Sequence, residues 1–346
     1  MSSNFISYLA ILSFHNHIFI PAMYCSEECK DSANRKYHDY ECEIMGSIQY
    51  SGTLHMSLRS FFLALSLFDK SINKMEQQLE QLKNSTSTVF DFNFSKYNNP
   101  DNDMNLLLAA FCLCRSNKLF PLEAQESILK KHSALKDIWK THETFIRNFL
   151  LRHAQISDSN FHGIYACRLK KKDLTNMNSF AIFNELQETI GSACFPFLSL
   201  INHSCAPNVI RTNVEGKVVI IVLRSIAAGD QLFDCYSANF NTHPRTERQS
   251  KLFKEFYFKC ECEACTLNFQ APPALKTIDI KVLHYAKKIE DDLINLKQHQ
   301  LKKKFNDICV AIEKSSPHFP CCDISLLQKC FAIYFLCAAK PAFQFA

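Results

Sequence analysis

The chain has 346 residues, long enough for two ordinary domains or for one large domain with appendages. Hydrophobic residues make up 47% and charged residues 21%, a composition that excludes a disordered tail or a fibre. The net charge is +5, from 39 Lys and Arg against 34 Asp and Glu. Such a mild excess, without a long basic stripe, does not indicate nucleic-acid binding.

Glycine is scarce, with six residues in the whole chain. No two of them have the spacing of a phosphate-binding loop, whether of the G-x-G-x-x-G or the Walker type. The sequence therefore excludes nucleotide binding through a glycine-rich turn between a strand and a helix.

The first half of the chain predicts helices after a start, residues 1–22, that fits no pattern downstream. Apolar residues recur at helical spacing over 53–69, and a glutamine-rich polar helix follows to about Lys83. After a polar loop at 84–103, helical patterns return at 104–114 and 121–153.

The second half predicts strands and then helices. Residues 217–224 form an apolar, β-branched run after Glu215-Gly216, which predicts a hairpin turn leading into a buried strand. Residues 230–236 continue as a strand, and 245–256 return to a helical pattern. Beyond Cys265, amphipathic patterns over 275–296, 299–313 and 324–339 predict an antiparallel helical bundle or repeat.

Cysteine is abundant, at 17 residues, which indicates either a secreted disulfide framework or an intracellular metal protein. Residues 5–14 are apolar, but no Lys or Arg precedes them and no small-residue cleavage site follows. They also fall short of the ~20 residues that span a bilayer. We therefore expect a reducing, intracellular compartment, namely cytoplasm and nucleus, and no membrane association.

The first cysteine cluster combines Cys25-x3-Cys29 with His38-x3-Cys42. Residues four apart lie on one helix face, so His38 and Cys42 can reach one metal ion, and zinc takes four such N or S donors. The competing interpretation is a few buried thiols and a surface histidine.

The second cluster is Cys260-x-Cys262-x2-Cys265. Three thiolates in one turn require a fourth ligand, and Cys205, in the pattern Asn202-His203-Ser204-Cys205, is the most interesting candidate. Such a site is closed, which predicts a structural zinc and not a catalytic one.

Two further features are unusual for ordinary structure. Polar Asn202 and His203 directly follow an apolar run, and Pro207 then stops any helix. Tyr236 ends a predicted strand, a common place for a functional hydroxyl. Each residue taken alone is more often structural than functional.

Together these segments resemble the SET and MYND domain-containing family of protein-lysine methyltransferases. The matching sequences are MYCSEEC and YHDYEC, NSF at 178–180, FPFLSLINHSCAPN at 195–208, GDQLFDCY at 229–236, and RTERQSKLFKEFYFKCECEAC at 245–265. The resemblance implies an α+β fold, with a SET-domain β-fold, a helical insert, a partial MYND zinc finger, a post-SET zinc site and a C-terminal repeat-like helical segment.

The resemblance also implies domain bounds. They are an unassigned start (1–22), a partial MYND-type finger (23–46), a helical insert region (47–160), a SET core (161–240), a post-SET zinc segment (241–270) and C-terminal helices (271–346). Family members begin the SET domain before the finger, and nothing before Met23 resembles that segment, so we expect the chain to be N-terminally incomplete.

The roles of individual residues follow from the same resemblance. Tyr236 matches the catalytic tyrosine, and S-adenosylmethionine would be bound by Asn178, Asn202, His203, Tyr236 and Phe258. Phe180 and Ser199 match positions that line the lysine channel. The implied zinc ligands are Cys25, Cys29, His38 and Cys42 in the finger, and Cys205, Cys260, Cys262 and Cys265 in the post-SET site.

We therefore expect an S-adenosylmethionine-dependent protein-lysine N-methyltransferase that acts on histone or other protein lysines, with Zn²⁺ as a structural ion. The finger and the helical tail are expected to bind protein partners. The alternative is a catalytically silent SET and MYND interaction module in transcriptional regulation. A zinc-dependent nucleic-acid binder is favoured only by the slight basicity, and we expect no direct nucleic-acid binding.

Overall fold

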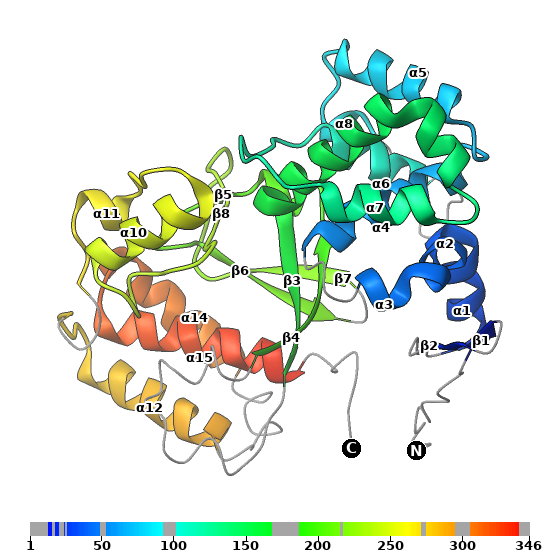
Figure 1. Ribbon diagram of the computed structural model, residues 1–346. Coiled ribbons are helices and arrows are strands. Elements are labelled where there is room, and N and C mark those ends of the chain that lie inside the picture. Colours follow the sequence, from blue (N-terminus) through cyan, green and yellow to red (C-terminus); the bar gives the residue numbers. More distant parts are fainter. Residues whose placement is uncertain are drawn as a thin grey trace. The chain divides into compact units, whose positions relative to one another are not determined.

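The computed structural model describes residues 13–15, 18–20, 24, 26–48, 53–92, 102–167, 187–214, 217–270, 275–294 and 305–338. The chain divides into two compact units (Figure 1). The first comprises Met1–Phe161 and Cys194–Phe197, and the second comprises His162–Ala193 and Leu198–Ala346. Among the described residues, no helix combines the length and the hydropathy needed to cross a membrane.

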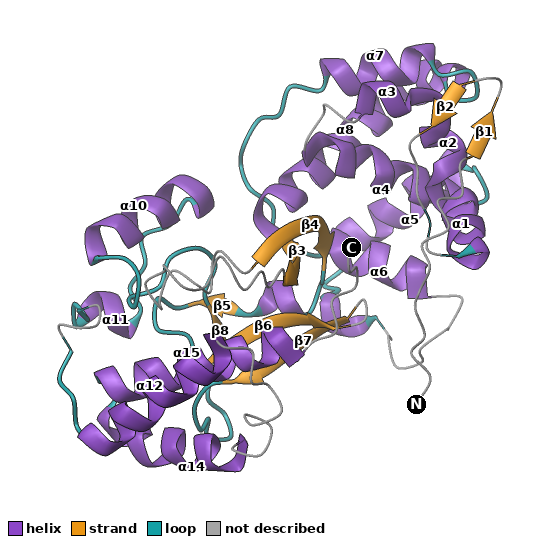
Figure 2. Ribbon diagram, turned by 90° about the horizontal axis from the view of Figure 1, so that it is seen from below, coloured by secondary structure: helices purple, strands orange, loops and turns teal. Residues whose placement is uncertain are grey.

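The first unit is almost entirely helical (Figure 2). Its helices are α1 (Glu27–Ala33), α2 (Asp39–Glu41), α3 (Met45–Ile48), α4 (Thr53–Leu67), α5 (Ile72–Lys83), α6 (Asn102–Phe111), α7 (Glu123–Lys131) and α8 (Lys136–Asn160). A π-helical turn at Asn34–His38 joins α1 to α2, and strands β1 (Ser13–His15) and β2 (Ile18–Ile20) pair antiparallel.

The core of this unit is formed mainly by α4 and α8, which pack against each other. Helix α4 buries Leu58, Phe61, Phe62 and Leu65, whose spacing of three and four residues places them on one face. The helical pattern predicted over 53–69 is therefore confirmed, and its apolar stripe is the buried one.

A buried ion pair joins α2 to α4. The carboxylate of Glu41 is fully buried and accepts two hydrogen bonds of 2.7 Å from Nε and Nη2 of Arg59, and it lies 3.0 Å from Nε2 of His55. Burial by itself raises the pKa of Glu41, but the hydrogen bonds with His55 and Arg59 outweigh it and hold this pKa below its ordinary value.

The helical pattern predicted over 121–153 is two helices in the structure, α7 and α8, and α8 continues to Asn160. The break begins at His132, whose backbone is extended. Its imidazole is buried, with Nε2 2.9 Å from the carbonyl of Tyr40 and Nδ1 accepting from the N–H of Ala134. These contacts satisfy the imidazole at the break, and sequence periodicity does not reveal them.

The second unit combines short strands with helices. Its strands are β3 (Phe161–Cys167, with its first residue in the other unit), β4 (Gln187–Cys194, with its last residue there), β5 (Asn202–His203), β6 (Val209–Val214), β7 (Lys217–Val222) and β8 (Phe233–Asp234). They form two-stranded sheets: β3 with β4, β5 with β8 in parallel, and β6 with β7 antiparallel. Its helices are α10 (Arg245–Phe256), α11 (Glu263–Thr266), α12 (Ile280–Ile294), α14 (Phe305–Ser315) and α15 (Cys322–Ala338). The mixed content confirms the α+β class.

The predicted hairpin is present, because β6 and β7 pair up to Val214 and Lys217; the turn between them lies outside the described residues. The prediction of a buried strand is wrong for most of β7, since Ile220 is 38% exposed and Val222 49% exposed. Ile221 packs into the core made with α12, α14 and α15, whereas its neighbours along the strand point to the opposite face of the two-stranded ribbon.

The three predicted C-terminal helices are confirmed as α12, α14 and α15, with shifted ends. Helix α12 begins later than predicted. Before it, the fully buried carboxylate of Asp323 accepts hydrogen bonds from the backbone N–H groups of Ile278 and Asp279, at 3.1 and 3.0 Å. Helices α12 and α14 both pack against α15.

Candidate functional site

The site begins where β5 and β8 lie side by side. Their parallel pairing sets Asn202 opposite Phe233 and His203 opposite Asp234. The side chain of Asn208 holds this pairing at one end, because its Oδ1 accepts from the N–H of Phe233 at 2.7 Å. The pairing brings the segment around His203 next to Tyr236, 33 residues later in the chain.

Tyr236 lies two residues after β8 and is held at both ends. Its hydroxyl donates to the backbone carbonyl of Ile201 at 2.8 Å, and its backbone N–H donates to Nδ1 of His203 at 3.0 Å. Its ring packs against those of His203 and Phe256, with centroids 5.2 and 5.0 Å away. Burial raises the pKa of Tyr236, and the nearby Asp234 carboxylate raises it further, so the hydroxyl stays protonated and can donate.

His203 is buried at the centre of the site. Its Nε2 lies 3.4 Å from Sγ of Cys205, and its ring meets that of Phe258 edge to face at 5.9 Å. Burial lowers the pKa of His203 to about 4, which makes the imidazole neutral near pH 7. Asn202, next to it, is exposed.

The structure thus brings His203, Tyr236 and Phe258 into one cluster, with Asn202 adjacent in β5. Ser199 lies in a short 3₁₀ helix, Leu198–Leu200, and its hydroxyl is 3.2 Å from Nε2 of His162. Asn178 and Phe180 lie outside the described residues.

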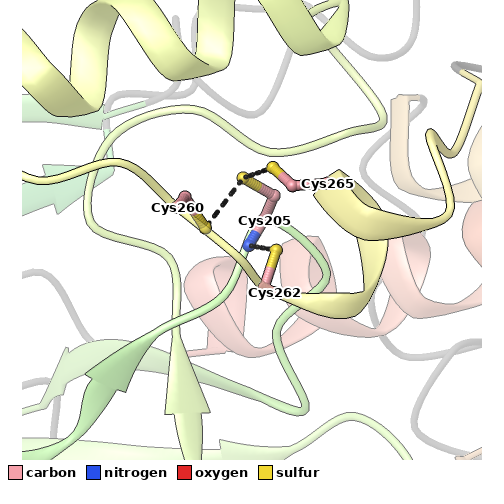
Figure 3. Close-up of side chains that lie close together, drawn as sticks. All are labelled: Cys205, Cys260, Cys262 and Cys265. Atoms are coloured by element: carbon pink, nitrogen blue, oxygen red, sulfur yellow. Dashed lines mark hydrogen bonds between the residues drawn. The ribbon is translucent and has the colours of Figure 1, made fainter.

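The four cysteines of the expected post-SET site converge (Figure 3). The sulfur atoms of Cys205, Cys260, Cys262 and Cys265 all lie within 4.8 Å of one another. Cys205 follows β5, whereas the other three lie in and before α11, and the backbone N–H of Cys205 donates to Sγ of Cys262 at 3.3 Å. Hydrogen bonds from the thiols of Cys205 and Cys260 lower the pKa of Cys262, so the cluster favours a thiolate.

The buried side chain of Arg248, next to the four cysteines, indicates whether this cluster suits a metal ion. Its side chain is fully buried, and it donates to the carbonyls of His243 and Ala264 at 2.8 and 3.0 Å. The Nη2 atom of Arg248 also lies 3.9 Å from Sγ of Cys265. Its Nε has no hydrogen-bond partner among the described residues. A buried cation requires nearby negative charge. Four thiolates around a divalent ion carry a net negative charge, so the residues present fit a tetrahedral zinc site.

The first cysteine cluster is described only in part. Cys25 lies outside the described residues, Cys29 is exposed in α1, and Cys42 is half-buried. His38 is buried and meets the ring of Tyr24 edge to face at 5.7 Å. Within the described ranges, this segment contains no group of three candidate metal ligands.

Two polar contacts near the site were not predicted from the sequence. Arg211 of β6 donates a hydrogen bond to the buried carboxylate of Asp234, directly before Cys235 and Tyr236. Burial raises the pKa of Asp234 although Arg211 opposes this. The second contact is His162 with Ser199. Burial, reinforced by the charge of Arg211, lowers the pKa of His162 to about 4. The sequence signal for the first contact was one ionic residue in each of two strands, Arg211 in β6 and Asp234 in β8. These strands belong to different two-stranded sheets, so only the folded unit relates the two residues.

Comparison with known proteins gives a consistent result. A SET domain family model matches residues 24–237. The chain is 25% identical to N-lysine methyltransferase SMYD2 of Rattus norvegicus over 78% of the chain and 64% of that relative, and 25% identical to the Homo sapiens protein over 64% and 52%. It is 26% identical to protein-lysine N-methyltransferase SMYD4 of Mus musculus, over 73% of the chain and 37% of that relative. The chain therefore spans less than two thirds of the length of these relatives.

Proposed function

Because the chain belongs to the SET-domain family and is of the SMYD type, we propose that it is an S-adenosylmethionine-dependent protein-lysine N-methyltransferase. The observation that carries this proposal is the place of Tyr236. Its hydroxyl is fixed by the Ile201 carbonyl, and its backbone by the His203 ring in the Asn-His-Ser-Cys segment. Histone and other protein lysines are the proposed substrates.

The cofactor would be bound by Asn202, His203, Tyr236 and Phe258, together with Asn178. S-adenosylmethionine would supply an electrophilic methyl group on a sulfonium ion. An aromatic ring such as that of Phe258 stabilises a cation at its face. Both ring nitrogens of His203 already contact protein atoms, so its contribution comes from its backbone and the faces of its ring.

Tyr236 is the proposed catalytic residue, and its role is orientation. A lysine ammonium is not a nucleophile, and its ordinary pKa is ~10.4. An apolar channel, to which Phe180 and Ser199 are assigned, disfavours the charged form and lowers that pKa. The Tyr236 hydroxyl and the nearby Ile201 carbonyl then hold the neutral amine in line with the methyl group, so most of the rate gain is positioning.

Two metal sites complete the proposal. Cys205, Cys260, Cys262 and Cys265 would hold a structural zinc that fastens the post-SET segment, 241–270, to the SET core, 161–240. Cys25, Cys29, His38 and Cys42 would belong to a partial MYND finger, 23–46, which with the helices of 271–346 would bind protein partners. Residues 47–160 are the proposed helical insert. We assign the protein to cytoplasm and nucleus.

The test is calorimetric titration of the purified protein with S-adenosylmethionine, using Asn202→Ala as the site variant. The Asn202 side chain is exposed, so its loss leaves the fold intact, while a lost hydrogen bond to the cofactor weakens binding about 10-fold. Asn73→Ala, an exposed asparagine on α5, is the matched control and binds as the parent does. A folded protein that binds no cofactor would favour the silent interaction module instead.

A further inference from the structure

His203 contacts the cysteine cluster with one ring nitrogen and Tyr236 with the other. Nε2 lies 3.4 Å from Sγ of Cys205, and Nδ1 lies 3.0 Å from the backbone nitrogen of Tyr236. The His203 residue is 8% exposed, and its ring packs against Tyr236 and Phe258. One buried side chain therefore bridges an expected metal ligand and the proposed catalytic residue.

The hydrogen-bond partners assign the proton on this ring. A backbone N–H can only donate, so Nδ1 of His203 accepts from Tyr236 and carries no proton. A neutral imidazole then carries its proton on Nε2, the atom that faces the sulfur of Cys205. His203 thus donates an N–H···S hydrogen bond to Cys205, the kind of contact that fixes and tunes metal-bound thiolates.

We propose that His203 is a positioning residue through which the four-cysteine metal site fixes the place of Tyr236. The link runs from the Cys205 sulfur through Nε2–H and Nδ1 to the backbone N–H of Tyr236, whose hydroxyl is bound to Ile201. Its consequence for catalysis rests on the proposed methyl transfer. The physical coupling between the metal site and Tyr236 is independent of methyl transfer, and it can be measured without substrate or cofactor.

Two substitutions separate the two halves of the link. Asn at position 203 places an amide oxygen near the Nδ1 position, where it accepts from Tyr236, but it is too short to reach Cys205. Gln at that position reaches toward Cys205 with its amide N–H but offers no acceptor near Nδ1. His203→Asn therefore breaks the contact with the metal ligand, and His203→Gln breaks the contact with Tyr236. The exposed His284 of α12, changed to Asn, is the control.

The first readout is the metal itself. With the site loaded with cadmium, the NMR resonance of the bound ion responds to hydrogen bonds at its sulfur ligands. We expect this resonance to shift in His203→Asn and to stay near the parent value in His203→Gln and His284→Asn. We also expect a chelator to remove zinc about 10-fold faster or more from His203→Asn, the usual size of an effect from a group that supports a metal ligand.

The second readout is Tyr236. Fluorotyrosine is incorporated throughout, and the Tyr236 resonance is identified by its absence in Tyr236→Phe. Exchanging zinc for cadmium lengthens the metal–sulfur bonds and should move this resonance in the parent, but much less in either His203 variant. Thermal unfolding establishes that each variant is folded.

The coupling is contradicted if the Tyr236 resonance does not respond to the metal exchange in the parent, or if it responds as strongly in the His203 variants as in the parent. It is also contradicted if the protein binds no metal at the cysteines. A protein that shows the coupling but neither binds S-adenosylmethionine nor transfers methyl would overturn the proposed function and leave the coupling standing.

Discussion

His153 is expected to make the first unit, which comprises Met1–Phe161 and Cys194–Phe197, less stable in acid. It lies on α8, fully buried, with its ring stacked on Phe149 at 4.2 Å and near Phe111 at 5.8 Å. Its Nε2 has no hydrogen-bond partner among the described residues. Burial first, and the charge of Arg152 second, lower the pKa of His153 to about 3.

The sign and the size of the effect follow from proton linkage. The ordinary pKa of 6.5 applies to the unfolded chain, so between pH 6.5 and about 3 the unfolded state binds a proton at His153 that the folded state does not. The contribution of neutral His153 to the free energy of unfolding is therefore fully present above pH 6.5. It is lost progressively as the pH falls from 6.5 towards 3. At pH 5 the loss from this one residue is about 2 kcal/mol.

The assay is urea unfolding at pH 7 and pH 5, followed by tryptophan fluorescence. Trp139 is the only tryptophan in the chain and is buried in the same unit as His153, so its fluorescence reports the unfolding of this unit. His153→Phe keeps an aromatic ring between its neighbours and removes the titrating group. Between pH 7 and pH 5, we expect the free energy of unfolding to fall by about 2 kcal/mol less in this variant than in the parent.

The exposed His284→Gln is the control for this measurement and should lose as much stability as the parent. If His153→Phe lost stability between pH 7 and pH 5 to the same extent as the parent, His153 would not be held neutral by burial. The reasoning from its surroundings would then be wrong.

Two further predictions concern the metal cluster and the buried ion pair. Cys262→Ser should lose about one zinc per chain by elemental analysis and destabilise the unit that contains it, and unchanged metal content would show that these cysteines are not ligands. Glu41→Gln should destabilise the first unit by about 1.5 kcal/mol in urea unfolding followed by Trp139 fluorescence, because it weakens the hydrogen bonds to Arg59, whose side chain is 35% exposed and so keeps part of its hydration. A loss below ~0.5 kcal/mol would contradict the role of this pair.

Local pattern was sufficient for the helices. Apolar residues at helical spacing predicted α4, α12 and α14, because each buries one face. The helical pattern of α15 was also correct, although this helix is buried at every position from Asp323 to Phe331. The ends were less predictable, since they depend on partners distant in sequence. Asp323, for example, binds the backbone before α12 from a segment more than forty residues away.

Long-range pairing limited prediction of the site. The spacing of Cys260, Cys262 and Cys265 marked a metal site by itself, and the Asn-His-Ser-Cys segment supplied Cys205 as a candidate partner. Nothing local related Arg211 to Asp234, because that contact depends on where β6 and β8 lie in the folded unit. The exposure of β7 was mispredicted for a similar reason: an apolar run does not specify how many of its faces are covered.

The central claim is tested most directly by methyl transfer. Purified protein is incubated with S-adenosylmethionine carrying a labelled methyl group and with candidate protein substrates, and the label is located by mass spectrometry, with Tyr236→Phe in parallel. Removing the Tyr236 hydroxyl breaks one hydrogen bond, which costs ~1 kcal/mol of stability, so cofactor binding should survive. We predict that the parent labels lysine side chains and that Tyr236→Phe does so at least ~10²-fold more slowly. Equal rates in the two proteins would show that Tyr236 is not catalytic, and a folded, cofactor-bound parent that labels no lysine would contradict the account.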